Sequence, residues 1–143
     1  QGAVVDDTLQ TSREGIFACG NVLHVHDLVD FVSAESFKAG RAAAAYAMGK
    51  RRAGDAIAVR DGQGVRGVVP QRLLRQDAPE AVQLMFRPDA VYENATLRIL
   101  DGEREVLRQR KRILTPGEMV EVTLKPEHIA ALSGGDVTVC IAR

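Results

Sequence analysis

The chain has 143 residues, of which 45% are hydrophobic and 27% are charged. This composition is typical of a globular chain with one or two small domains, and it excludes a disordered tail. Lysine plus arginine and aspartate plus glutamate both total 19, so the formal net charge is zero. A chain without a net charge has no global field that attracts nucleic acid, and we expect no nucleic-acid partner.

The longest apolar runs, such as residues 42–47, are far too short to cross a bilayer, and the N-terminus lacks the charged-then-apolar order of a signal peptide. We therefore expect no membrane span and a cytoplasmic location. Cys19 and Cys140 both lie inside apolar runs, where a reduced, buried thiol behaves as a small hydrophobic side chain. We expect both thiols to be structural rather than redox-active.

Two short apolar runs near the N-terminus, residues 3–5 and 16–19, are bounded by turn-forming residues. Such runs are typical of buried strands in an α/β sheet. Two strands cannot form a sheet core alone, and the apolar pattern begins only two positions after Gln1. We therefore expect the chain to be part of a longer protein.

Residues 30–48 have the pattern of a helix, with Asp30 placed to cap its N-terminus and Gly49 placed to end it. The cations at residues 50–52 follow, where they complement the helix C-terminus. Glu35, Lys38 and Arg41 are predicted to form one polar stripe. A second face of small residues is predicted to pack closely on another element; it comprises Gly40, Ala43, Ala44 and Ala47.

Residues 53–56 are predicted to be a linker, beyond which the pattern changes to short strands. Strand-length runs occur at residues 57–59, 65–69, 82–86, 95–100, 105–108, 120–124 and 137–141, separated by turns rich in glycine, proline and aspartate. Residues 126–132 are predicted to form one short helix. Residues 57–143 are therefore expected to form an all-β domain of about seven strands, either an immunoglobulin-like sandwich or a barrel.

The segment TSREGIFACGN at residues 11–21 resembles the second flavin-binding motif of the pyridine nucleotide-disulfide oxidoreductase superfamily. In that motif a threonine opens a turn, a strand follows, and Gly-Asp closes it. The resemblance implies that Gly20 and Asn21 contact FAD, because glycine lets the backbone approach the cofactor and the next side chain hydrogen-bonds its ribityl or phosphate region. Asn21 replaces the usual aspartate, which keeps a hydrogen-bond acceptor and loses the charge.

By the same resemblance, the N-terminus of the helix that starts near Asp30 points at the pyrimidine edge of the flavin. This implies cofactor contacts by the backbone of Phe31 and Val32. The resemblance predicts residues 1–52 to be the last strand and helix of a Rossmann-like FAD-binding domain, an α/β remnant followed by the all-β sandwich domain. It names FAD as the cofactor of the full-length protein and leaves NAD(P) open as a second one.

Residues 20–35 resemble a narrower subgroup, the FAD-dependent oxidoreductases near the anaerobic glycerol-3-phosphate dehydrogenase and amino-acid-oxidising families. Members of this subgroup end in a β-rich domain, which residues 67–72 and 115–119 resemble. The chain has no N-terminal Gly-x-Gly-x-x-Gly fingerprint and no Cys-x-x-Cys pair. We therefore expect this chain alone to bind FAD weakly and to lack activity.

The sequence HVHD at residues 24–27 places two histidines two positions apart. We predict no metal site there, because no further clustered ligands accompany them. The preferred interpretation is a loop over the flavin, and the alternative is that His24 or His26 faces the flavin or substrate as an acid–base group. These two histidines are the catalytic candidates.

Residues 108–112 form a basic run without aromatic residues, which favours a solvated strand edge over a nucleic-acid site. Two functions stay open. The chain is either part of an FAD-dependent oxidoreductase or a β-sandwich module for protein interaction or oligomerisation without its own activity. The expected partners are the upstream part of the same chain and a second copy or another subunit.

Overall fold

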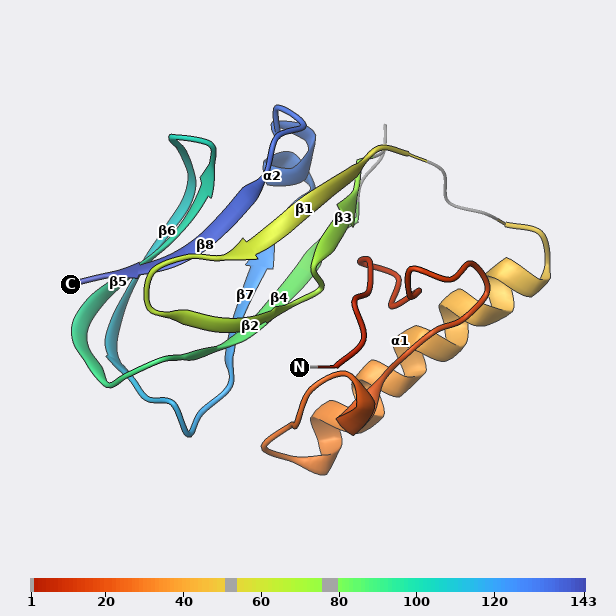
Figure 1. Cartoon of the computed structure of the whole chain (residues 1–143), viewed down its shortest axis with the longest axis horizontal. Helices are drawn as coiled ribbons and strands as arrows, with labels where there is room; N and C mark the ends of the chain where they lie inside the picture. Colours follow the sequence, from red (N-terminus) through yellow and green to blue (C-terminus); the bar gives the residue numbers. More distant parts are fainter. Residues whose placement is uncertain (1, 51–53, 76–79) are drawn as a thin grey trace.

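A computed structural model describes residues 2–50, 54–75 and 80–143 (Figure 1). These residues form one 3-10 turn, two helices and eight strands: η1 (Gly20–Val22), α1 (Val29–Ala47), β1 (Ala56–Asp61), β2 (Val65–Val69), β3 (Arg72–Leu74), β4 (Val82–Pro88), β5 (Tyr92–Asp101), β6 (Arg104–Leu114), β7 (Val120–Leu124), α2 (Pro126–Ala130) and β8 (Val137–Ala142). The described part of the chain is therefore mostly β-structure.

The strands make two sheets that share one apolar core. The larger sheet has the order β3-β1-β8-β5-β6 and the smaller one has the order β2-β4-β7. Neighbouring strands are antiparallel except β1 and β8, which are parallel. Leu84 and Phe86 of β4 and Leu97 and Ile99 of β5 belong to this core, and all four are fully buried. Alternate residues along β4 and β5 are buried, as expected of strands with one face on the core.

The seven strands predicted from apolar runs are confirmed, and the run at residues 126–132 contains helix α2. The sequence missed β3, since three residues are too few to show an alternating pattern. β6 extends to Leu114, well beyond the predicted residues 105–108. The basic run at residues 108–112 lies on β6, the edge strand of the larger sheet, so the prediction of a strand edge is confirmed.

The two predicted N-terminal strands are wrong. Residues 3–5 and 16–19 form only isolated bridges, Val5 with Thr11 and Gln10 with Phe17. A buried strand needs neighbours on both sides, and no sheet strand of the described chain pairs with these segments. The turn between them is instead held by Asp6, whose carboxylate accepts hydrogen bonds from the Thr8 amide and hydroxyl.

Helix α1 confirms the predicted helix and differs at its start. The N-cap is Leu28, without a side-chain cap, and Asp30 lies inside the first turn. At the other end Gly49 has φ +80°, and the amides of Gly49 and Lys50 donate to the carbonyls of Tyr46 and Ala45. This is a Schellman end, as the glycine predicted. Arg51 and Arg52 lie outside the described residues.

The small-residue face of α1 does not pack closely on another element within the described chain, contrary to the prediction. A Cβ added to Gly40 would meet no atom within 4 Å, and Ala44 and Ala47 are exposed. Neither α1 nor α2 is long and apolar enough to cross a membrane.

The N-terminal segment docks on the β-rich part of the chain. The Val5 amide donates to Gln71 Oε1 at 2.9 Å, and the Gln71 and Arg72 amides donate to the Val5 carbonyl. A second apolar cluster joins the two parts and contains Val5, Leu9, Ala18, Leu23, Ala39 and Val69. Of the predicted linker, Gly54 and Asp55 lie between α1 and β1, Ala56 already belongs to β1, and Ala53 lies outside the described residues.

Replacing Phe86 by alanine tests the shared core. Phe86 is fully buried between the sheets, so we expect Phe86→Ala to lower the free energy of unfolding by about 3–5 kcal/mol. Phe37→Ala is the matched control, because Phe37 on α1 is 74% exposed and should change stability by about 0.5 kcal/mol or less. Urea unfolding measures both, and equal losses would contradict the placement of the core.

Candidate functional site

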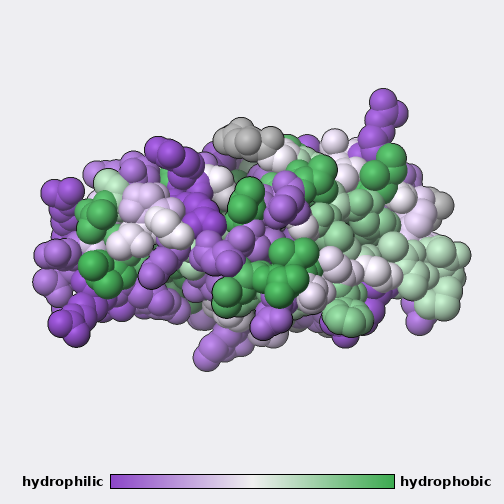
Figure 2. Space-filling view, turned by 90° about the horizontal axis from the view of Figure 1, so that it is seen from below, coloured by the Kyte–Doolittle hydropathy of each residue, from purple (hydrophilic) through white to green (hydrophobic). Residues whose placement is uncertain are grey.

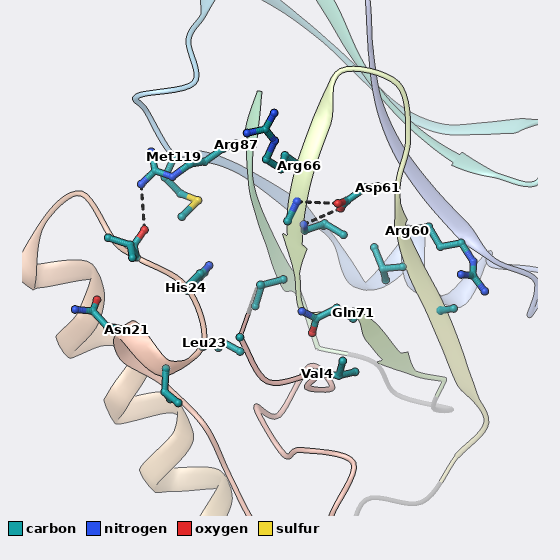
Figure 3. Close-up of a pocket in the computed structure, with 18 residues that line it drawn as sticks. Val4, Asn21, Leu23, His24, Arg60, Asp61, Arg66, Gln71, Arg87 and Met119 are labelled. Carbon is teal, nitrogen blue, oxygen red and sulfur yellow. Dashed lines mark hydrogen bonds between the residues drawn. The ribbon is translucent and has the colours of Figure 1, made fainter. Parts of the chain in front are cut away.

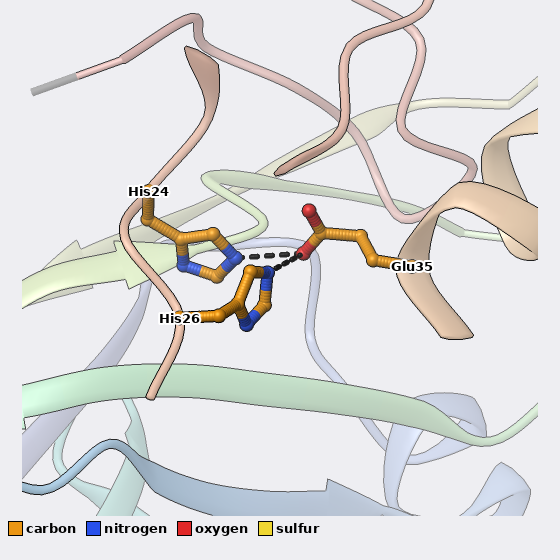
Figure 4. A group of neighbouring side chains, drawn as sticks. All are labelled: His24, His26 and Glu35. Atoms are coloured by element: carbon orange, nitrogen blue, oxygen red, sulfur yellow. Dashed lines mark hydrogen bonds and ion pairs between the residues drawn. The ribbon is translucent and has the colours of Figure 1, made fainter. Parts of the chain in front are cut away.

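Loop residues 20–28 and helix α1 bring four groups together: the amide of Gly20 and the side chains of His24, His26 and Glu35 (Figure 4). The two histidines come from the loop that precedes α1, and Glu35 points back at them from the second turn of the helix. Side-chain exposure is 10% for His24, 1% for His26 and 3% for Glu35. We call these three buried side chains the His-His-Glu cluster.

The burial of Glu35 corrects the polar stripe predicted for α1. Its Oε1 atom accepts a hydrogen bond from the Gly20 amide at 2.6 Å, and its Oε2 atom lies 2.6 Å from His24 Nε2. A carboxylate loses much hydration when it is buried, and these charge-assisted bonds replace the lost water. Glu35 therefore ties the loop to the helix rather than facing solvent.

His26 is held differently from His24. Its Nε2 atom lies 3.1 Å from the same Glu35 oxygen without hydrogen-bond alignment, and its ring meets the His24 ring edge-on at a centroid distance of 4.3 Å. The Nδ1 atoms of both rings are buried and have no hydrogen-bond partner among the residues that the structure describes. Buried polar atoms without partners are rare in native folds and point to a missing ligand or water.

The electrostatics of the His-His-Glu cluster favour an ionised Glu35. Burial acts to raise the pKa of Glu35, but the contacts of His24, His26 and the Gly20 amide outweigh it, and the pKa lies below its ordinary value of 4.5. An ionised carboxylate can only accept hydrogen bonds, so His24 must donate from Nε2. In its neutral form His24 therefore has Nδ1 as the acceptor nitrogen.

A cavity of about 710 Å³ opens beside the His-His-Glu cluster, between loop residues 20–28 and the strands β1 and β2 (Figure 3). Asn21 and His24 line it from the loop. Arg60, Asp61 and Arg66 line the opposite side, so the cavity has charged residues of both signs on one wall and an imidazole on the other, and Arg60 is paired with Asp136.

The segment that connects β1 to β2 beside this cavity, together with the start of β2, has a Gly-x-Gly-x-x-Gly spacing at residues 62–67. It joins a strand of the larger sheet to a strand of the smaller one rather than a strand to a helix, so it offers no helix N-terminus to a phosphate. The Asp61 carboxylate already accepts hydrogen bonds from the amides of Gly67 and Val68, both at 2.8 Å. The spacing is therefore not a dinucleotide-binding fingerprint.

An ion pair fixes the loop on its other side. Arg87 of β4 donates from Nη2 to Asp27 Oδ1 at 2.6 Å and to the Val25 carbonyl at 3.0 Å. The Met119 amide donates to Asp27 Oδ2 at 2.8 Å. This amide, followed by the Arg87 guanidinium, lowers the pKa of Asp27. The loop that carries both histidines is thus anchored to α1 by Glu35 and to the β-rich part by Asp27.

The residues predicted to contact a cofactor lie on either side of the loop. Gly20 is buried with φ +70°, and Asn21 is exposed on the cavity wall. Phe31 and Val32 lie in the first turn of α1, and Val32 Cγ1 would be 3.6 Å from a Cβ atom at Gly20. The structure therefore places Gly20 next to Val32, while Phe31 lies nearer His26, with 6.5 Å between ring centroids.

The two cysteines are free and half-buried. Cys19 packs against the second apolar cluster, and burial raises the pKa of the Cys140 thiol. A raised thiol pKa reduces the reactive thiolate, in agreement with a structural role for Cys140.

Protein-family models, curated proteins and solved structures yield no match to this chain.

Sequence reasoning found His24 and His26 and missed Glu35 as their partner. Glu35 follows His24 by eleven positions, and the helical periodicity predicted for this segment placed it on one polar face with Lys38 and Arg41. The available signal was an acidic residue in the second turn of a helix that directly follows a His-x-His loop. Such a residue lies near the loop because that loop leads into the helix.

Replacing Glu35 by glutamine tests the buried carboxylate. We expect Glu35→Gln to lower the free energy of unfolding at neutral pH by about 1–3 kcal/mol, because the ring nitrogen and the Gly20 amide lose a charged acceptor. The lowered pKa of Glu35 stabilises the fold above pH 4.5, and this contribution is lost as the pH falls through the folded-state pKa.

The pH dependence of unfolding distinguishes the loss of a buried, ionised carboxylate from a general loss of stability. The wild type should lose stability more steeply than Glu35→Gln as the pH falls from neutral to below 4.5. Glu93→Gln, at an exposed position of β5, is the control and should follow the wild type. Parallel acid-unfolding curves for the wild type and Glu35→Gln would show that Glu35 is not paired in the folded chain.

Proposed function

We propose that the chain is part of an FAD-dependent oxidoreductase, in which residues 1–52 complete the flavin site and the β-rich domain follows. The proposal combines the resemblance of residues 11–21 to a flavin-binding motif with the geometry of the turn that ends this segment. The main observation in support of this proposal is that Gly20 and Asn21 lie between the cavity and the start of α1.

The Gly20 turn positions the Asn21 side chain for a cofactor. Its φ of +70° lies in the left-handed region, which glycine adopts without strain. Asn21 projects from this turn at the cavity wall, where its amide can both donate to and accept from a ribityl hydroxyl. The Gly20 amide itself donates to Glu35, so the cofactor contact assigned to this turn falls on the Asn21 side chain.

The start of α1 is the second supporting feature. Leu28 provides no side-chain cap, and the Phe31 amide donates to the Leu28 carbonyl at 3.2 Å. The amides of Val29 and Asp30 precede it in the first turn, where a helix N-terminus favours negative charge. We therefore assign the contact with the flavin pyrimidine edge to the amides of Val29 and Asp30, because the predicted Phe31 amide already donates within the first turn.

His24 is the residue that we assign to proton transfer at the cavity. Its ring lines the cavity, Glu35 holds its Nε2–H, and its Nδ1 atom is left to accept a proton. FAD, when bound, supplies the hydride acceptor for oxidation of a small substrate. His26 is more deeply buried and takes a supporting position behind His24.

A second candidate function is a protein-interaction or oligomerisation module. Apolar side chains gather on the surface around α1 (Figure 2), including the exposed residues Val25, Leu28, Val29, Phe37 and Met48. Exposed apolar surface of this kind is typical of protein contacts. In the flavoenzyme the same surface would meet the upstream part of the chain, a second copy or a partner subunit.

An FAD titration of a longer form of the protein that includes the upstream sequence tests the first function. We expect an oxidised-flavin spectrum, and we expect Asn21→Ala to weaken FAD binding by about threefold to tenfold, the value of one hydrogen bond. Asn94→Ala is the matched control, because Asn94 is exposed on β5, remote from the cavity lining. It should bind FAD as the wild type does.

Two results would count against a flavoenzyme. A folded longer protein that takes up no flavin would leave the interaction module as the better account. If Asn21→Ala and Asn94→Ala reduce flavin binding equally, the Gly20–Asn21 turn does not contact the cofactor.

A further inference from the structure

The His-His-Glu cluster has the donor set of a metal site. Each of its three residues offers one donor atom, and these three atoms lie within 4.8 Å of one another. His24 Nε2 and His26 Nε2 both approach the same oxygen of Glu35, at 2.6 and 3.1 Å (Figure 4). Two imidazoles and a carboxylate that converge on one point form a common ligand set for first-row transition metals.

The unpartnered nitrogens are an independent reason to expect a ligand. His26 Nε2 is buried, faces Glu35 and has no aligned hydrogen bond among the described residues. Its side chain is 1% exposed, so bulk water does not replace the missing partner. A metal ion bound to Nε2 would satisfy this atom, whereas the ion pair alone satisfies only His24.

We propose that His24, His26 and Glu35 bind a divalent transition-metal ion, with Zn²⁺ as the ion that this donor set suits best. The proposal does not depend on the flavin. It goes against the sequence-based prediction of no metal site, because that prediction lacked a third ligand and the fold supplies Glu35.

The present spacing needs a small adjustment to accept the ion. Tetrahedral Zn²⁺ with bonds of about 2.0–2.2 Å places its donors about 3.3–3.5 Å apart. His24 Nε2 and Glu35 Oε2, now 2.6 Å apart, would separate by roughly 0.7 Å as the ion replaces the proton between them. In a neutral His24 ring that proton moves to Nδ1, so with the ion bound His24 is a ligand and cannot also accept a proton at Nδ1.

Two features of the surroundings determine how tightly the proposed site would bind an ion and where that ion would lie. The Nδ1 atoms of both histidines lack a carbonyl or carboxylate partner in the part of the chain that the structure describes. Without such outer-shell bonds, affinity is expected to be about 10–100-fold weaker than in sites that have them. Of the three residues only His24 lines the 710 Å³ cavity, so the ion would lie behind the cavity wall, at its inner side.

Calorimetric titration of the chelator-treated chain with Zn²⁺ tests the proposal, with Co²⁺ as a visible probe of coordination. We expect one equivalent of Zn²⁺ to bind, and one equivalent of Co²⁺ to give the absorption of a site with nitrogen and oxygen donors. His26→Ala and Glu35→Gln should each weaken binding by about tenfold or more. The matched control is His128→Ala, since His128 on α2 is the one remaining histidine of the chain.

The experiment distinguishes metal binding by the His-His-Glu cluster from metal binding at a thiol and from loss of folding. A folded wild-type chain that binds no Zn²⁺ overturns the proposal, whatever the variants do. Binding that survives unchanged in folded His26→Ala and Glu35→Gln also overturns it, and loss of that binding in Cys19→Ser or Cys140→Ser would assign the ion to a thiol. Circular dichroism shows which variants are folded, and Glu35→Gln, which keeps the side-chain shape, serves where His26→Ala does not fold.

Discussion

A carboxylate that is removed from water must find hydrogen bonds in the protein, and Glu35 finds them in the segment that precedes its own helix. Its two oxygens contact the Gly20 amide and the imidazoles of His24 and His26. The path of residues 20–28 across the start of α1 depends on this pairing. If Glu35 faced solvent, the Gly20 turn and both histidines would lose their common acceptor.

The same loop has a second attachment, to the β-rich part of the chain. Arg87 holds Asp27 and the Val25 carbonyl, and Gln71 holds the N-terminal strand-like segment at Val5. Between these two attachments lies the cavity, with Asn21 and His24 on its loop side. The proposed flavin contact and the proposed metal ligands therefore share one short segment, whose position is set by interactions on both of its flanks.

Much of the β-rich fold could be predicted, because alternate burial along strands such as β4 and β5 leaves a pattern in the sequence. β3 was missed because three residues cannot show such a pattern. The N-terminal runs at residues 3–5 and 16–19 have the composition of buried strands without strand partners in the described chain, so their pattern led to the wrong structure. Glu35 was misplaced because a periodic pattern shows which helix face a residue shares but not what that face meets.

The most direct test of the His-His-Glu cluster is nitrogen-15 NMR of the histidine side chains in the metal-free chain at neutral pH. An ionised Glu35 beside His24 Nε2 predicts one ring with its proton fixed on Nε2 and with slow exchange of that proton with water. The signal should disappear in Glu35→Gln. Histidine rings that all average rapidly between tautomers, as in a solvated loop, would contradict the buried pairing.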